Sequence, residues 1–144
     1  MPTPARNGLA DKVWADLTRI VLDNKDTWRR AAVAAAGLPF SRIRILLRLA
    51  RNSMTVKEVA LAATIDAPAA TVAVNDLEDR GLVVREVDPN NRRSKLVSLT
   101  DAGRALVDTV KAIDDPAPTA LAGLADDDLA NLAELVAKIM AADS

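Results

Sequence analysis

Cysteine and histidine are both absent from this sequence of 144 residues. Without a thiol the chain cannot form disulfides, sense redox state through cysteine or bind metals through thiolates. Without an imidazole it lacks the commonest general base, metal ligand and pH switch of proteins. A carboxylate pair within residues 126–128 is the remaining catalytic candidate, but helix capping explains those aspartates fully. We therefore expect no enzyme activity, no metal and no cofactor.

Basic side chains concentrate in the middle of the chain. Residues 40–104 hold eleven basic and eight acidic side chains, whereas residues 105–144 hold two and eight. The whole chain is nearly neutral, with a net charge of −1. A solvated face explains a modest basic excess more often than a nucleic acid does, so the position of these residues has to decide.

The densest basic cluster lies between two β-rich runs, residues 82–87 and 95–99. The connecting residues 88–94 favour a turn, which predicts a hairpin with a long tip. A connection longer than its strands need usually has a function. A solvated tip is one interpretation, and insertion into the minor groove of DNA is the favoured one. The tip residues assigned to DNA are Asn91, Arg92, Arg93 and Lys95.

Two short helices are predicted before the hairpin. Thr55 and Glu58 have the spacing of a capping box, which predicts a helix over residues 56–63. After a three-residue turn, Asp66 can cap a second helix that ends at Gly81. Two short helices joined by a tight turn and followed at once by a hairpin are typical of a winged helix-turn-helix.

The second of these helices would be the one that reads DNA, and it lacks basic residues: from Ala67 to Asp79 it contains no lysine or arginine. Base reading must then rely on amide, hydroxyl and methyl groups. Asn75 and Thr71 are the main polar candidates, and Asp76 is a further one. The residues assigned to DNA here are Ala67, Pro68, Thr71, Val72 and Asn75.

A preceding helix is predicted over residues 40–51. The residues expected in the core are Ile43, Leu46, Leu47 and Ala50, which recur at helical spacing. The opposite stripe consists of Arg44, Arg48 and Arg51. A solubilising face is the simpler explanation of the stripe. Contact with the DNA backbone, by Arg44 and Arg48 together with Thr55, is the functional one.

Both ends of the chain are predicted to be helical. Residues 9–36 have the pattern of one long amphipathic helix, with Trp14 and Trp28 on one side of it. Aromatic residues on such a helix are core or interface far more often than ligand walls. We assign both rings to the interior of a dimer.

Toward the other end, Thr100 can cap a helix that reaches residue 113. Pro116 and Pro118 then interrupt the helical pattern. A last helix is predicted over residues 126–142, with apolar residues along one side.

Four motifs occur in a fixed order between residues 55 and 103. They are Thr55-Val56-Lys57-Glu58-Val59-Ala60, Leu77-Glu78-Asp79-Arg80-Gly81-Leu82-Val83, Asp88-Pro89-Asn90-Asn91-Arg92-Arg93-Ser94-Lys95 and Leu99-Thr100-Asp101-Ala102-Gly103. In this order and at this spacing they resemble the MarR (multiple antibiotic resistance regulator) family. One departure is Asn91, where the family usually has an aspartate that holds the wing arginine.

The resemblance implies a homodimer in which the first and last helices of two chains intertwine and each protomer offers DNA a recognition helix and a wing. It also implies a cleft where small, often phenolic, molecules relieve repression. The residues assigned to the dimer interface are Trp14, Leu17, Leu129, Leu132, Val136 and Ile139.

The predicted fold class is mainly α with a small β-hairpin: a winged helix-turn-helix domain plus a helical dimerisation region from both chain ends. The regions are 1–36 (dimerisation), 38–104 (DNA binding) and 105–144 (dimerisation), in one folding unit. The predicted function is a repressor that binds an inverted-repeat operator in double-stranded DNA as a homodimer and responds to a small aromatic effector. A winged-helix module used for protein contacts is the alternative. No apolar stretch approaches the roughly 20 residues of a membrane span and the start does not resemble a secretory signal, so we expect a soluble cytoplasmic protein without membrane contact.

Overall fold

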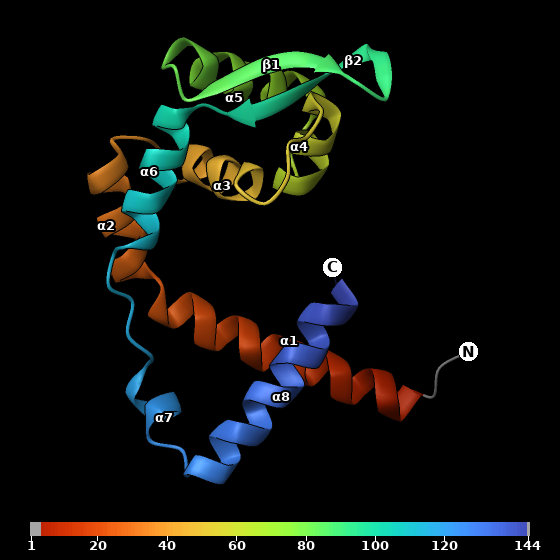
Figure 1. Cartoon of the computed structure of the whole chain (residues 1–144). Helices are drawn as coiled ribbons and strands as arrows, with labels where there is room; N and C mark the ends of the chain where they lie inside the picture. The colour runs from red at the N-terminus through yellow and green to blue at the C-terminus, as the bar shows by residue number, and fades with distance from the viewer. Residues whose placement is uncertain (1–3, 144) are drawn as a thin grey trace. The chain divides into compact units, whose positions relative to one another are not determined.

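The structure is a computed structural model and describes residues 4–143, with side chains from residue 8 onward (Figure 1). The chain divides into two compact units, and the boundary falls between Asp114 and Asp115. The elements of the first unit are α1 (Pro4–Asn24), α2 (Asp26–Ala36), α3 (Phe40–Leu49), α4 (Val56–Ala63), α5 (Ala67–Asp79), β1 (Val83–Asp88), β2 (Asn91–Leu99) and α6 (Asp101–Lys111). Those of the second are α7 (Thr119–Ala122) and α8 (Asp126–Asp143). The mainly α fold with one hairpin is as predicted.

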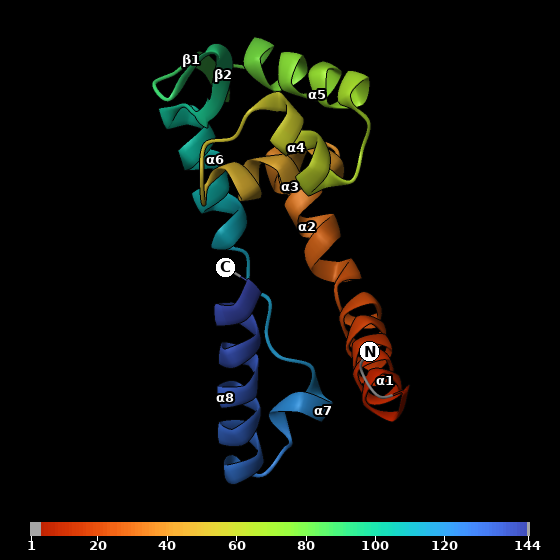
Figure 2. The same cartoon turned by 90° about the vertical axis from the view of Figure 1, so that its right-hand side faces the viewer.

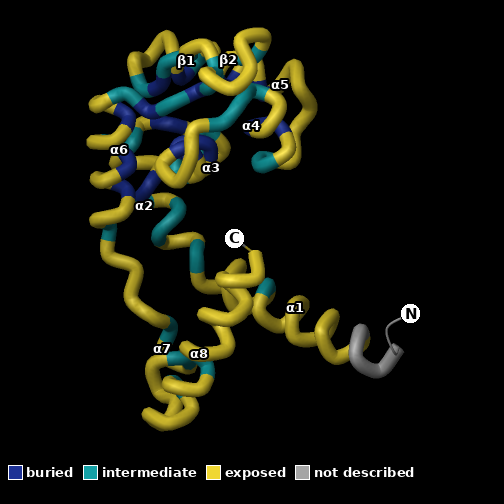
Figure 3. Tube along the Cα trace, turned by 45° about the vertical axis from the view of Figure 1, so that its right-hand side comes forward, coloured by how far each residue is buried: buried dark blue, intermediate teal, exposed yellow. Residues whose placement is uncertain are grey.

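The core of the first unit lies where α3, α4, α5, the hairpin and α6 meet, and Figure 3 shows the buried positions gathered there. Ile43 and Leu46 of α3 are almost fully buried, as the spacing predicted. Ala50 is exposed, contrary to the prediction, because α3 ends at Leu49 and the chain turns away there. Ile45 and Leu49 complete the buried face instead.

The predicted single helix over residues 9–36 is wrong, since the chain forms two helices that are separated at Lys25. Asparagine and aspartate are weak helix formers because their side chains compete for backbone hydrogen bonds. Here the Asn24 amide donates to the Ile20 carbonyl oxygen at 2.7 Å. Helix α2 ends as predicted at Gly37, whose left-handed φ of 66° closes the last turn.

Helix α2 packs on α3 through its aromatic residue. The Trp28 and Phe40 rings meet edge to face, with centroids 5.9 Å apart, and the Arg29 guanidinium lies 4.6 Å from the centre of the Phe40 ring. Trp28 is half-buried against the core of its own protomer. The ring therefore contributes to the core of the first unit.

The helix-turn-helix forms as its capping residues predict. The Thr55 hydroxyl accepts the Glu58 backbone N–H at 3.1 Å, and the Glu58 carboxylate accepts the Thr55 N–H at 3.2 Å. Asp66 then accepts the Ala69 N–H at 2.7 Å and starts α5. Figure 2 shows α4 and α5 joined by this short turn.

The hairpin differs from its prediction at the tip. The strands β1 and β2 extend to Asp88 and Asn91, which pair with each other across a two-residue turn. Val87 already pairs with Lys95, so the residues between Asn91 and Lys95 form an irregularity in the long strand β2. The predicted seven-residue loop is therefore wrong: the ladder is interrupted at the basic residues and resumes at the turn.

Helix α6 is locked to the base of the hairpin. The Thr100 hydroxyl accepts the Gly103 N–H at 3.1 Å, as a cap, and donates to the Gly81 carbonyl oxygen at 2.6 Å. The Thr100 N–H also donates to the Leu82 carbonyl oxygen at 3.0 Å. A Cβ on Gly103 would lie 2.1 Å from that same Leu82 oxygen, so only glycine fits there.

In the second unit, the segment with Pro116 and Pro118 is not helical, as predicted, and α8 follows the predicted boundaries to within one residue. The short helix α7 was not predicted. No described residue of α8 is buried. Across residues 4–143, none of the helices combines the length and the apolar character that crossing a bilayer requires.

Candidate nucleic-acid interface

The exposed face of α5 carries the predicted base-reading residues. Thr71, Val72 and Asn75 are all exposed, and Val72 has 61% of its surface accessible. The Thr71 hydroxyl donates to the Ala67 carbonyl oxygen at 3.0 Å, so its oxygen is left as an acceptor. Ala67 and Pro68 are exposed at the start of the same helix. The face is a short strip of methyl, hydroxyl and amide groups.

Asp76 does not belong to this strip, although the sequence suggested it. Its carboxylate is 3.2 Å from the Arg42 Nε of α3 and 3.2 Å from the Arg80 Nε one turn further along the chain. Hydrogen bonds from Arg80 and then Arg42 lower the pKa of Asp76 below its ordinary value. The carboxylate therefore fastens α5 to α3, and two guanidinium groups balance its charge.

Arg85 is a residue that sequence reasoning missed. It lies in β1, and its guanidinium donates to the Asn75 Oδ1 on α5. The Arg85 Nε is 3.6 Å from the Glu78 Oε1, which is an ion pair beyond hydrogen-bond distance. The signal available in the sequence was a single arginine inside the apolar run of β1, where a charge needs a partner.

The wing carries the basic residues at its surface. Arg92, Arg93 and Lys95 are exposed. Within residues 4–143, none of the three forms an ion pair with a carboxylate. Asn91 accepts the backbone N–H of Arg93 at 3.1 Å, so it shapes the wing through the main chain instead of holding a guanidinium.

The wing is tied to the helix-turn-helix by backbone pairing. Met54, just before α4, exchanges two hydrogen bonds with Val97 of β2, at 3.1 and 2.7 Å. The hydroxyls of Ser53 and Ser98 lie 2.7 Å apart beside this pair. The wing and the start of α4 are therefore held in one fixed arrangement.

The residues predicted to contact the DNA backbone differ in whether their side chains are already hydrogen-bonded within the chain. The Thr55 hydroxyl is committed to Glu58, since it accepts the Glu58 N–H and donates to the Glu58 carboxylate at 3.0 Å. Arg44 and Arg48 are both exposed on α3, as predicted. Arg44 lines a small hollow with Ile65 and Ala69, at the turn and the first residues of α5. This places Arg44 beside the N-terminal end of α5.

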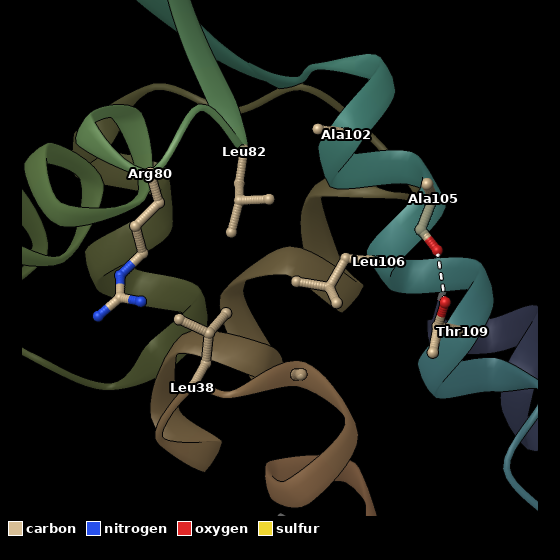
Figure 4. Close-up of a pocket in the computed structure, with 8 residues that line it drawn as sticks. Leu38, Arg80, Leu82, Ala102, Ala105, Leu106 and Thr109 are labelled. Atoms are coloured by element: carbon tan, nitrogen blue, oxygen red, sulfur yellow. Dashed lines mark hydrogen bonds between the residues drawn. The ribbon is translucent and has the colours of Figure 1, made fainter.

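A second, larger hollow of about 660 Å³ opens between α2, α6 and the base of the hairpin. Leu38, Leu82 and Leu106 face into it, and the Arg80 guanidinium lies at its side (Figure 4). The Thr109 hydroxyl is turned to the Ala105 carbonyl oxygen at 3.0 Å. The hollow is thus lined mainly by apolar side chains, with the Arg80 guanidinium as the one cation among the described residues that line it. Among residues 4–143, no group of three carboxylate, thiol or imidazole side chains is arranged to hold a metal ion.

The residues assigned to a dimer interface lie on two exposed helices. On α1, Trp14 is 71% exposed, and Leu17 is also exposed. On α8, Val136 and Ile139 are exposed, and Leu129 and Leu132 are half-buried. Further exposed apolar residues on α1 are Leu9, Val13, Ile20, Val21 and Leu22. Each helix therefore presents large apolar side chains to solvent in the described part of the chain.

Two short helices joined by a tight turn, α4 and α5, followed by the hairpin of β1 and β2, have the arrangement of a winged helix-turn-helix, the fold of a class of DNA-binding proteins. A family model described as the MarR family matches residues 36–94. An uncharacterized HTH-type transcriptional regulator of Bacillus subtilis, YwhA, is 34% identical over 62 residues, which is 43% of this chain and 43% of that protein. The match thus spans less than half the length of that relative.

Solved structures match over more of the chain. CouR from Rhodococcus jostii, bound to p-coumaroyl-CoA, is 28% identical with a TM-score of 0.65 over 91% of this chain and 93% of that chain. A point mutant of MepR from S. aureus, bound to an oligodeoxyribonucleotide, is 20% identical with a TM-score of 0.59 over 91% and 98%. The chain is therefore similar to MarR-family transcriptional regulators in the sequence of residues 36–94 and in its fold.

Proposed function

We propose that the chain represses transcription as a homodimer that binds an inverted repeat in duplex DNA. The observation that carries this is the presence of two surfaces: the exposed strip of Thr71, Val72 and Asn75 on α5, and the exposed cations Arg92 and Arg93 on the wing. The first has the groups that read base edges in a major groove, and the second has the charge that a phosphate backbone or a narrow minor groove attracts.

In this proposal the residues divide into two roles. Asn75, Thr71 and the Val72 methyl groups read bases, with Ala67 and Pro68 close to the groove floor at the start of α5. The wing residues Asn91 to Lys95 set affinity and register, together with Arg44 and Arg48 of α3 and the main chain at Thr55. Phosphate contacts of this kind position a protein without carrying sequence information.

A homodimer accounts for the exposed apolar side chains of α1 and α8. Trp14, Leu17 and the α8 residues Val136 and Ile139 are large apolar side chains that water would otherwise surround. Several large exposed apolar side chains on one helix are typical of an interface in soluble proteins. A two-fold dimer would present its recognition helices to successive major grooves about 34 Å apart, which gives half-sites about 10 base pairs apart.

A small aromatic effector that relieves repression is part of the proposal. CouR, at 28% identity, has p-coumaroyl-CoA bound. In this chain the hollow with Leu38, Leu82 and Leu106 offers apolar walls, and Arg80 offers a cation to an acidic or phenolic group. Arg80 also holds Asp76 of the reading helix, so a ligand that draws on Arg80 would act directly on that helix.

The alternative is a winged-helix module that contacts proteins only. The absence of lysine and arginine between Ala67 and Asp79 is the observation that favours it, since most of the attraction to DNA then rests on the wing. The two functions differ in their response to salt, because a DNA reader releases counterions on binding and an adaptor has none to release.

Titration of the purified chain into labelled genomic fragments from its source, over a series of salt concentrations, tests the proposal. We expect a preference for some fragments and a steep fall in affinity with salt, with a slope of log affinity against log salt set by the number of phosphates neutralised. Sedimentation at micromolar concentration should give a dimer. Weak binding with no fragment preference, or a monomer, would contradict the proposal and favour the protein-contact module.

A further inference from the structure

Arg85 contacts the side-chain amide of Asn75, a residue predicted to read DNA, and can therefore fix the orientation of that amide. Strand β1 contacts α5, beside which Figure 1 draws it. The Arg85 side chain is only 22% exposed, and it lies along the flank of α5 against Asn75 and Glu78, which are three residues apart and so neighbours on the helix. The guanidinium is thus engaged by the recognition helix.

We propose that Arg85 is a positioning residue that fixes the Asn75 amide so that it reads keto bases, guanine or thymine, in each half-site. This inference rests on the proposed function. The Asn75 Oδ1 accepts from the Arg85 guanidinium, which holds the amide plane and turns the Asn75 NH₂ group away from Arg85. Glu78 balances the charge of the arginine and keeps it in place.

The chemistry of the amide gives the preferred base. A free asparagine pairs with adenine through two bonds, accepting from the adenine N6 amino group and donating to N7. When Oδ1 is occupied, a second donor approaching it meets the positive hydrogens of the guanidinium. The amide is left with its NH₂ group, which donates to the O6 and N7 of guanine or the O4 of thymine. Adenine offers the acceptor N7 but places its N6 amino donor where guanine has the acceptor O6, and cytosine offers only its N4 amino group, so both are disfavoured.

The test is selection of bound duplexes from random DNA by the full chain, compared among the parent, Arg85→Ala, Asn75→Ala and the double variant. In the parent we expect guanine or thymine at one position of each half-site, by about tenfold over adenine. Asn75→Ala should abolish that preference. Arg85→Ala should move it to adenine, because the freed amide can then form both bonds. In the Asn75→Ala background, Arg85→Ala should have no further effect at that position.

Glu86→Ala is the matched control, because Glu86 is the next residue of β1 and is exposed, and strand alternation turns its side chain to the opposite face from Arg85. It should leave the preference unchanged. Asn75→Asp keeps the acceptor for Arg85 and replaces the NH₂ group by an oxygen, so it should turn the preference toward cytosine, whose N4 group donates. This variant keeps the inference testable if Arg85→Ala fails to fold.

A keto preference that survives in Arg85→Ala or in Asn75→Asp would overturn the inference and leave the proposed function standing. An effect of Arg85→Ala that is the same with and without Asn75 would also overturn it, since Arg85 would then act elsewhere. If the parent enriches no sequence at all, the proposed function is wrong, and this inference, which depends on it, is wrong as well.

Discussion

Replacement of Gly103 by alanine should destabilise the protein strongly, although the same change normally stabilises a helix. The new Cβ would lie 2.1 Å from the Leu82 carbonyl oxygen and 3.3 Å from the Leu99 Cδ2. Carbon and oxygen atoms in contact stay more than about 3.3 Å apart, so α6 has to move by about 1 Å from the base of the hairpin.

That movement acts on the hydrogen bonds which join α6 to the wing. The Leu82 oxygen also accepts the Thr100 N–H at 3.0 Å, and the Thr100 hydroxyl donates to Gly81 at 2.6 Å. Overpacking costs about 1–3 kcal/mol, and each weakened bond adds about 1 kcal/mol. The intrinsic preference of helices for alanine over glycine offsets about 1 kcal/mol of this destabilisation. We expect a net loss of about 2–4 kcal/mol in the free energy of unfolding.

Urea denaturation measures this loss, at one fixed protein concentration because the stability of the proposed dimer would depend on concentration. Gly8→Ala is the matched control. Gly8 lies within α1, and a Cβ added to it would meet nothing within 4 Å, so the alanine should stabilise by up to about 1 kcal/mol. A Gly103→Ala protein as stable as the parent would refute the tight junction between α6 and the hairpin.

Three further predictions concern the wing, the dimer and the reading helix. Arg93→Ala should weaken binding to all DNA and lower the slope of log affinity against log salt by about one unit, with the selected sequence unchanged; an equal slope would refute a phosphate or groove contact. Trp14→Glu should shift the sedimentation of the chain from dimer to monomer, whereas Lys12→Glu, on an exposed polar position of the same helix, should not. Asp76 has a lowered pKa through Arg80 and Arg42, so its stabilisation is present above its ordinary value of 3.8 and is lost as the pH falls through the folded-state pKa. Asp76→Asn should therefore be less stable than the parent at neutral pH, and thermal melting should show this difference shrinking in acid; a constant difference would contradict the ion-pair account.

The parts of the fold that could be predicted are those determined within a few residues. Thr55, Asp66 and Thr100 each accept a backbone N–H three residues ahead, so a pattern of four residues is enough to place the start of the helix. The exposed positions of Arg44 and Arg48 on α3 were predicted for a similar reason, because helical spacing puts them on one face, whereas Arg51 of the predicted stripe lies beyond the end of α3 at Leu49.

The parts that were missed depend on competition between weak local preferences or on contacts across the fold. Nothing in the apolar spacing of residues 9–36 shows that the Asn24 side chain turns back to the chain and that the helix breaks at Lys25. The hairpin tip was missed because both a wide loop and a two-residue turn with a strand irregularity fit the residues between Val87 and Lys95.

The same limit applies to the site. The exposure of Thr71 and Asn75 on one face of α5 could be predicted from helical spacing alone. The contact between Arg85 and Asn75 could not, because it requires the chain to reverse at Gly81, whose φ is 74°, and bring β1 back along the helix. Asp76 shows the opposite error: its position on α5 suggested a contact with DNA, but Arg42 reaches it from a helix 34 residues earlier.

Selection of bound duplexes from random DNA tests the central claim most directly, because it examines DNA binding, symmetry and half-site spacing in one experiment. We predict an enriched inverted repeat with half-sites about 10 base pairs apart, since a two-fold dimer meets successive major grooves. An enriched sequence without a dyad would contradict the homodimer, and no enrichment at moderate salt would contradict a sequence-reading regulator altogether.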